Sequence, residues 1–302
     1  MNLAPICIFV FNRPFHTKKM LEALLLNNEI SDSQVYIFCD NYKKGASNSL
    51  IRQVNEVRNL VNSYKNELKI EIIFRDENFG LSRNIISGVS YVLEKHEQII
   101  VLEDDLIASK GFLKYMNEAL ELYRNDLQVG CIHAWNEDVD MSKYCETTFF
   151  LSGADCWGWA TWKRAWELFN PNGNDLLKQI ISNDLQYFFN RRGRIDYIKM
   201  LEDQIIGQNN SWAIRWHASI FLNKMYCLYP VKSLIRNIGL DGSGTHSGFS
   251  YMNQNVIDFL PIRKITINES EYYYTSSQKS DSYSYILKQF WKIKFLIKRL
   301  WL

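Results

Sequence analysis

Three features are missing from this sequence: a long apolar run, a strong charge of one sign and a glycine-rich first loop. No apolar run approaches the length of about 20 residues that a membrane-spanning helix needs, and the N-terminus lacks the pattern of a signal peptide. The net charge of +2 is too small to indicate nucleic-acid binding. The loop after the first apolar stretch has neither G-x-G-x-x-G nor a P-loop, which argues against a dinucleotide-binding Rossmann domain.

Paired cysteines are missing as well, because none of the cysteines forms a C-x-x-C motif. The six cysteines are Cys7, Cys39, Cys131, Cys145, Cys156 and Cys227. Three of them lie inside apolar stretches typical of strands. This distribution is typical of reduced, buried thiols and not of a disulfide or zinc framework. We therefore expect a cytoplasmic protein.

The composition is that of a globular protein with a substantial core. Of the 302 residues, 47% are hydrophobic and 23% are charged, which is not the composition of a disordered chain. Aromatic residues are abundant, with 9 Trp, 17 Tyr and 17 Phe. They suit a carbohydrate-handling surface and equally suit a large core.

Apolar and amphipathic stretches alternate along the first third of the chain. Apolar stretches typical of buried strands cover 5–11, 34–39, 69–74 and 99–102. Helical patterns between them cover 16–26, 49–65 and 81–94. A β-α-β-α-β-α-β order predicts an α/β fold with a parallel sheet and right-handed crossovers.

An acidic triplet ends the fourth predicted strand. Glu103, Asp104 and Asp105 follow the apolar residues 99–102 and precede a helical pattern that begins near Ser109. Carboxylates at the carboxyl end of a parallel strand face the edge where such sheets bind ligands. Burying three of them is costly unless a cation pairs with them. The alternative interpretation is a solvated acidic turn.

Polar side chains also follow the other three predicted strands. Asn12 and Arg13 come after the first strand, Asp40 after the second, and the segment 78–83 after the third. At one sheet edge they would offer hydrogen bonds to a nucleobase and a ribose, and positive charge to phosphates. Each of them is also an ordinary turn residue, so the prediction depends on all of them together.

The second half contains a stretch in which small residues alternate with tryptophan. Strands are expected over 128–133 and 147–151, followed by the Trp/Gly stretch 152–162 and a helix over 161–169. Backbone can approach a ligand at the glycines while indole rings form a wall. The alternative is a tryptophan-rich corner of the core.

Two further segments carry polar side chains that could take part in catalysis or in metal binding. An amphipathic helix over 196–208 contains Glu202 and Asp203, and a glycine-rich loop over 237–246 ends in His246. Adjacent acids on a helix are usually a solvated face, and a single loop histidine is usually surface. The functional alternatives are a general base and an imidazole that closes over a metal-bound diphosphate.

Taken together, these motifs resemble the GT-A glycosyltransferases. The sequence Val-Leu-Glu-Asp-Asp-Leu at 101–106, followed by the helix 111–116, is similar to the metal motif of the Golgi N-acetylglucosaminyltransferase that begins complex N-glycans. Bacterial relatives in surface-polysaccharide synthesis share it. The segments 153–162 and 201–203, and then His246, match in order the acceptor-side loop, the catalytic acid and the C-terminal histidine of that family.

The resemblance implies a nucleoside diphosphate-sugar donor, here a UDP-sugar, and a divalent cation. Asp105 and His246 would bind Mn²⁺ or Mg²⁺, since oxygen ligands suit these ions better than zinc. Arg13 and Asp40 would hold the uridine, and Ser82 or Arg83 would lie near the phosphates. The complete set of expected donor-binding residues is Asn12, Arg13, Asp40, Ser82, Arg83, Glu103, Asp104, Trp157 and Gly158.

The reaction implied by the resemblance is an inverting transfer of a hexosyl or N-acetylhexosaminyl group. Asp203 would take the proton from the acceptor hydroxyl as that oxygen attacks the anomeric carbon from the opposite face. The acceptor would be a glycan or a lipid-linked sugar in bacterial surface-polysaccharide synthesis. Two alternatives are a non-catalytic, membrane-associated scaffold with the same fold and a nucleotidyltransferase, and the first loop disfavours the latter.

The expected domain organisation is one GT-A domain over 1–265, followed by a polar linker and a basic helix over 266–302. The domain divides into a donor half, 1–127, and an acceptor half, 128–265. After Asp281 the tail has lysines and an arginine but no acid. Apolar residues recur at helical spacing, which predicts an amphipathic helix lying on an anionic inner-membrane surface. The alternative is a terminal helix docked on the domain or on a second subunit.

Overall fold

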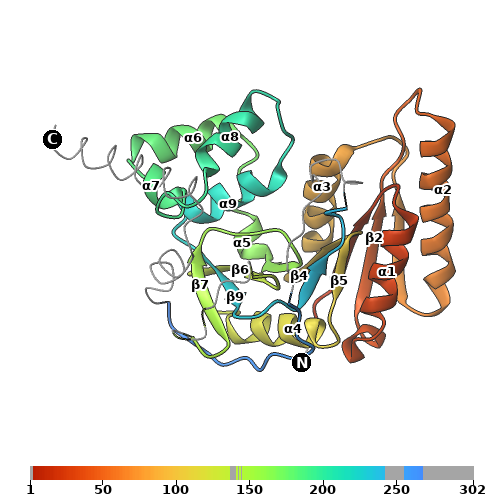
Figure 1. Ribbon diagram of the computed structural model, residues 1–302, viewed down its shortest axis with the longest axis horizontal. Coiled ribbons are helices and arrows are strands. Elements are labelled where there is room, and N and C mark those ends of the chain that lie inside the picture. The colour runs from red at the N-terminus through yellow and green to blue at the C-terminus, as the bar shows by residue number, and fades with distance from the viewer. Residues whose placement is uncertain (1–2, 137–140, 142, 144, 242–254, 268–302) are drawn as a thin grey trace.

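The computed structural model is an α/β protein with one large sheet between two layers of helices, and it describes residues 3–136, 141, 143, 145–241 and 255–267 (Figure 1). The sheet has eight strands in the order β3-β2-β1-β4-β8-β6-β9-β7. A second, two-stranded sheet joins β10 to β5. The expected GT-A-type central sheet flanked by helices is confirmed, whereas the tail helix and His246 lie outside the described residues.

The first half of the sheet is parallel, as predicted. Its strands are β1 (Ile6–Val10), β2 (Gln34–Cys39), β3 (Lys69–Phe74) and β4 (Gln98–Glu103). The connecting helices are α1 (Pro14–Leu24), α2 (Asn48–Ser63) and α3 (Gly80–Lys95), with 3₁₀ turns η1 (Asn28–Ser31) and η2 (Tyr64–Asn66). β1 pairs in parallel with both β2 and β4. A proline suits the first position of a helix because its fixed φ is already helical, and α1 begins at Pro14.

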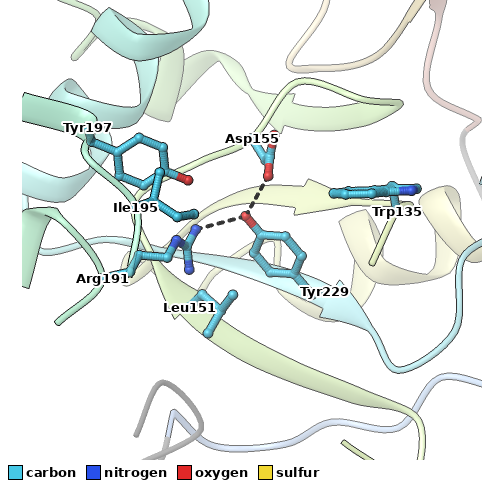
Figure 2. Close-up of a pocket in the computed structure, with 7 residues that line it drawn as sticks. All are labelled: Trp135, Leu151, Asp155, Arg191, Ile195, Tyr197 and Tyr229. Carbon is cyan, nitrogen blue, oxygen red and sulfur yellow. Dashed lines mark hydrogen bonds between the residues drawn. The ribbon is translucent and has the colours of Figure 1, made fainter. Parts of the chain in front are cut away.

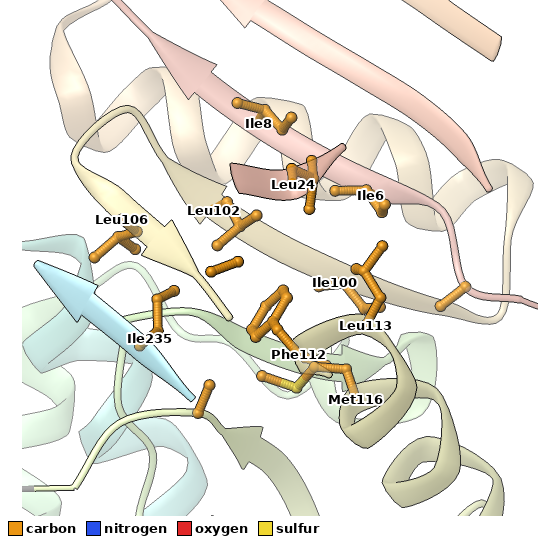
Figure 3. Close-up of a cluster of buried hydrophobic side chains, with 14 of the residues drawn as sticks. Ile6, Ile8, Leu24, Ile100, Leu102, Leu106, Phe112, Leu113, Met116 and Ile235 are labelled. Carbon is orange, nitrogen blue, oxygen red and sulfur yellow. The ribbon is translucent and has the colours of Figure 1, made fainter. Parts of the chain in front are cut away.

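Side chains of the central strands point alternately to two buried cores, which explains why the sequences of these strands are apolar throughout. Ile6 and Ile8 of β1 point into the core beneath α1 and α4 (Phe112–Leu122), which Figure 3 shows together with Leu102 of β4. Phe9 points to the opposite core, against α3. Side chains alternate between faces along a strand, so a strand buried on both faces loses the polar alternation of an exposed one.

The second half of the sheet is mixed. Its strands are β6 (Val129–His133), β7 (Thr148–Ser152), β8 (Trp159–Trp162) and β9 (Tyr226–Pro230). β8 inserts antiparallel between β4 and β6, and β7 pairs antiparallel with β9. The helix expected over 161–169 is wrong at its start, because Thr161 and Trp162 belong to β8 and only α5 (Lys163–Trp166) follows. Pairing with β4 overrides the helical pattern there.

Four helices form a lobe beside the sheet. They are α6 (Gly173–Ser182), α7 (Gln186–Phe189), α8 (Tyr197–Ile205) and α9 (Trp212–Leu222). Asn172, Asp196 and Ser211 accept hydrogen bonds from backbone N–H groups in the first turns of α6, α8 and α9, which is the usual way that a sequence starts a helix. The lobe has its own small apolar core and lies across from α3 in Figure 1.

A short antiparallel pair brings a late segment back to the end of β4. β5 (Leu106–Ala108) follows the acidic triplet and pairs with β10 (Ile235–Asn237). The residues after β10 therefore lie beside the turn between β4 and β5. Within the part of the chain described here, no helix is long and apolar enough to cross a membrane.

Candidate active site

The carboxyl ends of β1 and β4 lie side by side and carry the acidic triplet and Arg13. The parallel register places Phe9 beside Glu103, so the residues that follow each strand emerge at the same edge. Asp104 and Asp105 form the turn between β4 and β5. The structure thus brings together four of the predicted site residues, at the edge where parallel sheets bind ligands.

Arg13 is the positive charge of this acidic cluster. Its Nη1 donates to Asp105 Oδ2 at 3.0 Å, and its Nη2 lies 3.6 Å from Asp104 Oδ1. Burial by itself lowers the pKa of Arg13, but the carboxylates of Asp104 and Asp105 outweigh this effect and raise the pKa overall. Arg13 therefore stays charged and holds Asp105 in place.

One guanidinium does not balance three carboxylates. Burial and repulsion by Asp105 and Asp104 raise the pKa of Glu103 to about 8. Burial also raises the pKa of Asp104 to about 7, although Arg13 opposes this shift. Raised carboxyl pKa values mean that the charged forms lack sufficient compensation. A cation or a ligand with positive charge would relieve this condition.

The segment 238–241 crosses over the acidic cluster. Ile238 N donates to Asp105 O at 2.9 Å, and His16 Nε2 lies 3.1 Å from Asp241 Oδ2. A Cβ on Gly239 would lie 2.1 Å from Asp105 Oδ2 and 2.9 Å from Arg13 Nη1. Only glycine therefore allows the backbone to come this close to the carboxylate. We call residues 238–241 the strap.

Asp40 shapes the loop at the start of α3. Its carboxylate accepts hydrogen bonds from the N–H groups of Phe79 at 2.8 Å and of Gly80 at 2.9 Å. It also accepts from Asn41 N at 2.8 Å. A carboxylate at a helix N-terminus is favoured by the helix dipole. Asp40 is buried beside the donor edge, and its predicted contact with a nucleobase stays a prediction.

The other predicted donor residues have separate partners. Asn12 Nδ2 donates to Gln53 Oε1 at 3.3 Å. Ser82 is buried and accepts from Arg215 Nη2 of α9 at 2.6 Å, so it joins α3 to the helical lobe. Arg83 is exposed, pairs with Glu77 at 2.8 Å and lies over the Phe79 ring.

Some residues of the Trp/Gly stretch lie in the core and others lie closer to the site. Trp159 is buried among Trp166, Trp212 and Trp216, so the tryptophan-rich core corner is real at this position. Trp157 is only half-buried, and its backbone N–H donates to His133 Nε2 at 3.1 Å.

Residues 157 and 158 lie next to the donor edge. Val101 of β4 pairs with Trp159 of β8, so the two residues before β8 follow β4 toward Glu103. Gly158 has φ +62°, and a Cβ there would lie 2.5 Å from Ile235 Cδ1. This backbone conformation favours glycine.

A network around one acid, Asp155, lies at the other end of this stretch (Figure 2), and we call it the Asp155 cluster. Tyr229 OH donates to Asp155 Oδ2 at 3.2 Å and accepts from Arg191 Nη2 at 3.1 Å. Burial alone would raise the pKa of Asp155, but His133, the Cys156 N–H and Arg191 outweigh it and lower the pKa. Trp135 and Tyr197 line the same small cavity. This acid is internally satisfied.

Two buried histidines hold the backbone of the Trp/Gly stretch. His133 Nδ1 lies 2.9 Å from Trp135 O while its Nε2 accepts from Trp157 N, which makes Nδ1 the protonated nitrogen. His217 Nδ1 lies 2.7 Å from Ala154 O. Burial lowers the pKa of both, in His217 to about 3. Both rings therefore act as fixed supports of this backbone.

Asp203 is not part of the acidic cluster. It lies on α8 in the helical lobe, whereas the cluster lies at the end of β4. The Asp203 carboxylate forms an ion pair with Lys199 one turn earlier on the helix. Its side chain is 23% exposed, and α8 packs mainly against α6 and α9. The link from this lobe to the donor half is the Arg215–Ser82 hydrogen bond.

Three groups of residues at or near the site were missed by the sequence reasoning. Gly239 was part of the glycine-rich segment, but its contact with Asp105 depends on β10 pairing with β5. Arg75 follows β3 and lies over the rings of Phe38 and Phe79, and its place after a strand was an available signal. The Asp155 cluster joins residues far apart in the chain, which no local pattern indicates.

The donor chemistry of the acidic cluster fits a hard divalent cation. Among the described residues, no group of three or more His, Cys, Asp or Glu side chains is arranged to hold a metal ion by itself. The cluster nevertheless offers carboxyl oxygens, and the raised pKa values of Glu103 and Asp104 indicate that their charged forms lack a sufficient positive partner. Oxygen ligands and excess negative charge are what Mg²⁺ and Mn²⁺ select. Further ligands would come from a bound diphosphate.

Comparison with known proteins gives one family. The profile of Glycosyl transferase family 2 matches residues 6–193. No curated protein matches the chain.

Solved structures give distant likenesses. The mannosyltransferase PcManGT from Pyrobaculum calidifontis, in complex with GDP-Man and Mn²⁺, is 13% identical over 73% of this chain and 72% of that chain, with a TM-score of 0.39. TarS 1–349 of S. aureus is 11% identical over 74% and 60% of the two chains, with a TM-score of 0.38. The longer crystallised S. aureus TarS is 14% identical, with a TM-score of 0.31, and the match covers 44% of this chain but only 22% of that one.

Proposed function

Since the chain belongs to glycosyl transferase family 2, we propose that it is a metal-dependent, inverting glycosyltransferase that uses a nucleotide-sugar. It moves a hexosyl or N-acetylhexosaminyl group from a UDP-sugar to a glycan or lipid-linked acceptor in bacterial surface-polysaccharide synthesis. The observation that carries this proposal is the acidic cluster at the carboxyl end of β4, where three neighbouring carboxyl groups share one guanidinium partner, Arg13.

The donor is proposed to lie along the carboxyl ends of β1 to β4. Arg13 and Asp40, with Asn12 beside them, would hold the uridine, and Ser82 or Arg83 would lie near the phosphates. Trp157 and Gly158 would border the sugar, which fits their position beside the continuation of β4. The strap covers this edge on the side of Asp105.

Asp105, with His246, is proposed to hold Mn²⁺ or Mg²⁺. When bound, such an ion neutralises charge that develops on the leaving diphosphate. Glu103 and Asp104 lie beside Asp105 and would contact ribose, sugar hydroxyls or water. Arg13 would add a second positive charge toward the leaving group.

Asp203 is proposed as the base. Its carboxylate would accept the proton of the acceptor hydroxyl while that oxygen attacks the anomeric carbon opposite the diphosphate, and the configuration inverts. Lys199 holds the carboxylate at a defined place on α8. The Arg215–Ser82 hydrogen bond connects the lobe that carries Asp203 to the donor half.

The tail is proposed to place the enzyme on the inner membrane surface, where lipid-linked acceptors are found. Its basic amphipathic pattern supports this interpretation. Liposome flotation of the full chain and of a chain ending near residue 280, with anionic vesicles, tests it. Equal flotation of the two proteins would reject the membrane role.

Thermal unfolding with UDP tests the central proposal. We expect UDP to raise the unfolding temperature when Mn²⁺ is present and to have a much smaller effect with EDTA. Hydrolysis of a panel of UDP-sugars then identifies the donor sugar. No stabilisation by UDP under either condition, together with no hydrolysis, would favour a non-catalytic scaffold instead.

A further inference from the structure

Arg13 occupies one carboxylate oxygen of Asp105, the residue proposed to hold the cation. Its Nη1 donates to Asp105 Oδ2 at 3.0 Å, and both side chains are largely buried, at 21% and 15% exposure. The backbone of Gly239 lies against the same oxygen and against Nη1. The pair is therefore enclosed between the strap and the turn after β4.

A divalent cation on Asp105 would be only a few ångströms from the guanidinium. At that distance, in a site of reduced dielectric, the double positive charge of the ion and the single charge of the guanidinium repel each other. The cation and Arg13 therefore cannot both use Asp105 without loss. A nucleoside diphosphate changes this balance because its phosphates offer Arg13 another anionic partner.

We propose that Arg13 is a built-in counter-cation of Asp105 that competes with the divalent cation until a nucleoside diphosphate releases it. This inference rests on the proposed function, whose donor and cation sites it uses. It assigns Arg13 a regulatory part in addition to its donor contact. Cation and nucleotide then bind with positive coupling, and the coupling passes through one side chain.

Mn²⁺ binding measured by the electron paramagnetic resonance signal of the free ion tests this competition directly. The proteins are the wild type, Arg13→Gln and the matched control Lys19→Gln, each with and without UDP. Lys19 lies on α1, the helix that follows Arg13, is exposed and pairs with Glu22. Its variant therefore removes one positive charge at a position that does not contact Asp105. The readout does not depend on sugar transfer.

We expect Arg13→Gln to bind Mn²⁺ without UDP about tenfold more tightly than the wild type, because repulsion at Asp105 is removed. We expect UDP to strengthen Mn²⁺ binding to the wild type and to Lys19→Gln by a much larger factor than to Arg13→Gln. Arg13→Lys keeps the charge and should remain near the wild-type affinity, and it serves as the second variant if the glutamine variant folds poorly.

The outcomes separate this inference from the proposed function. Equal Mn²⁺ affinity of Arg13→Gln and the wild type without UDP, while UDP still strengthens binding in both, overturns the competition and leaves the proposed function intact. Failure of the wild type and Arg13→Gln alike to bind Mn²⁺ with UDP overturns the cation site of the proposed function and the inference with it. An Asp105→Asn protein with wild-type Mn²⁺ affinity has the same consequence.

Discussion

The molecule contains two groups of polar residues built around carboxylates, the acidic cluster at the donor edge and the Asp155 cluster, and they differ in how their charge is balanced. At the donor edge, burial raises the pKa of Glu103 to about 8. In the second half, the pKa of Asp155 is lowered because neighbouring groups outweigh its burial. Tyr229 lies between Asp155 and Arg191 and hydrogen-bonds to both.

The difference indicates two different tasks. A satisfied network fixes the position of the backbone around it, and the Asp155 cluster does this for the Trp/Gly stretch. In a cluster whose charge is not balanced, burial of the charged groups has an unfavourable free energy, and a ligand of opposite charge can offset it. Only the donor-edge cluster therefore has a physical reason to bind a cation and a diphosphate.

The largest expected effect concerns Asp203, an acid that belongs to neither cluster. We expect Asp203→Asn to lower turnover by about 10²–10⁴-fold, the usual contribution of a general base, while the affinity for UDP is unchanged. Transfer rates and UDP binding are the measurements. Glu202→Gln, the exposed neighbour, is the control. Near-native turnover of Asp203→Asn would remove Asp203 as the base.

The next effect concerns the unbalanced cluster. We expect Asp105→Asn to lower turnover by about 10²–10³-fold, since charge stabilisation of a leaving diphosphate is worth several kcal/mol. The unfolding temperature should change little, because the asparagine keeps an oxygen that can accept from Arg13 and no longer repels the carboxylates of Glu103 and Asp104. Glu118→Gln, on the surface of α4, controls for the loss of a carboxylate. An unfolding temperature that drops by many degrees would instead make Asp105 a structural residue like Asp155.

The satisfied cluster should respond in the opposite way. We expect Tyr229→Phe to lower the free energy of unfolding by about 1–3 kcal/mol, because Asp155 loses a donor and Arg191 loses an acceptor in a buried place. Urea unfolding measures this value. Tyr226→Phe, on the same strand and half-buried, is the matched control. Equal stability of the two variants would contradict the structural role of the cluster.

The last prediction is a pH dependence of stability that comes from the donor edge. The folded-state pKa of Glu103 is about 8 against an ordinary 4.5, and that of Asp104 is about 7 against 3.8. Between these values the folded chain keeps protons that the unfolded chain has released, so stability falls as pH rises from about 5 to 8.

Glu103→Gln should flatten that fall, because glutamine has no proton to lose. Unfolding temperatures of the wild type and of Glu103→Gln at several pH values between 5 and 8 measure the two slopes. Glu118→Gln again serves as the control. Identical slopes in all three proteins would mean that the acidic cluster is already balanced in the folded protein.

Local pattern was enough to predict the first half of the fold. Four continuous apolar strands and three amphipathic helices have the periodicities that the structure confirms, and the acidic triplet lies at the predicted edge. These features depend on neighbours in the sequence and on one rule, that parallel strands share a carboxyl edge.

What the sequence did not predict depends on contacts between distant residues. The insertion of β8 beside β4, the approach of Gly239 to Asp105 and the Asp155–Tyr229–Arg191 network all join residues at least 36 positions apart. Helical periodicity around Thr161 was misleading because tertiary pairing decides the conformation of a short segment. The positions of Asp203 and of the predicted donor residues relative to a bound sugar stay predictions.

The place of β8 in the sheet has a consequence for how the chain is made. Until residues 159–162 leave the ribosome, the apolar strand β4 has unpaired backbone N–H and C=O groups along one edge. These groups can pair with other nascent chains. A fragment ending at residue 127 would keep that edge exposed permanently. We therefore expect such a fragment to aggregate on expression, whereas a fragment that includes β8 can pair this strand with the free edge of β4.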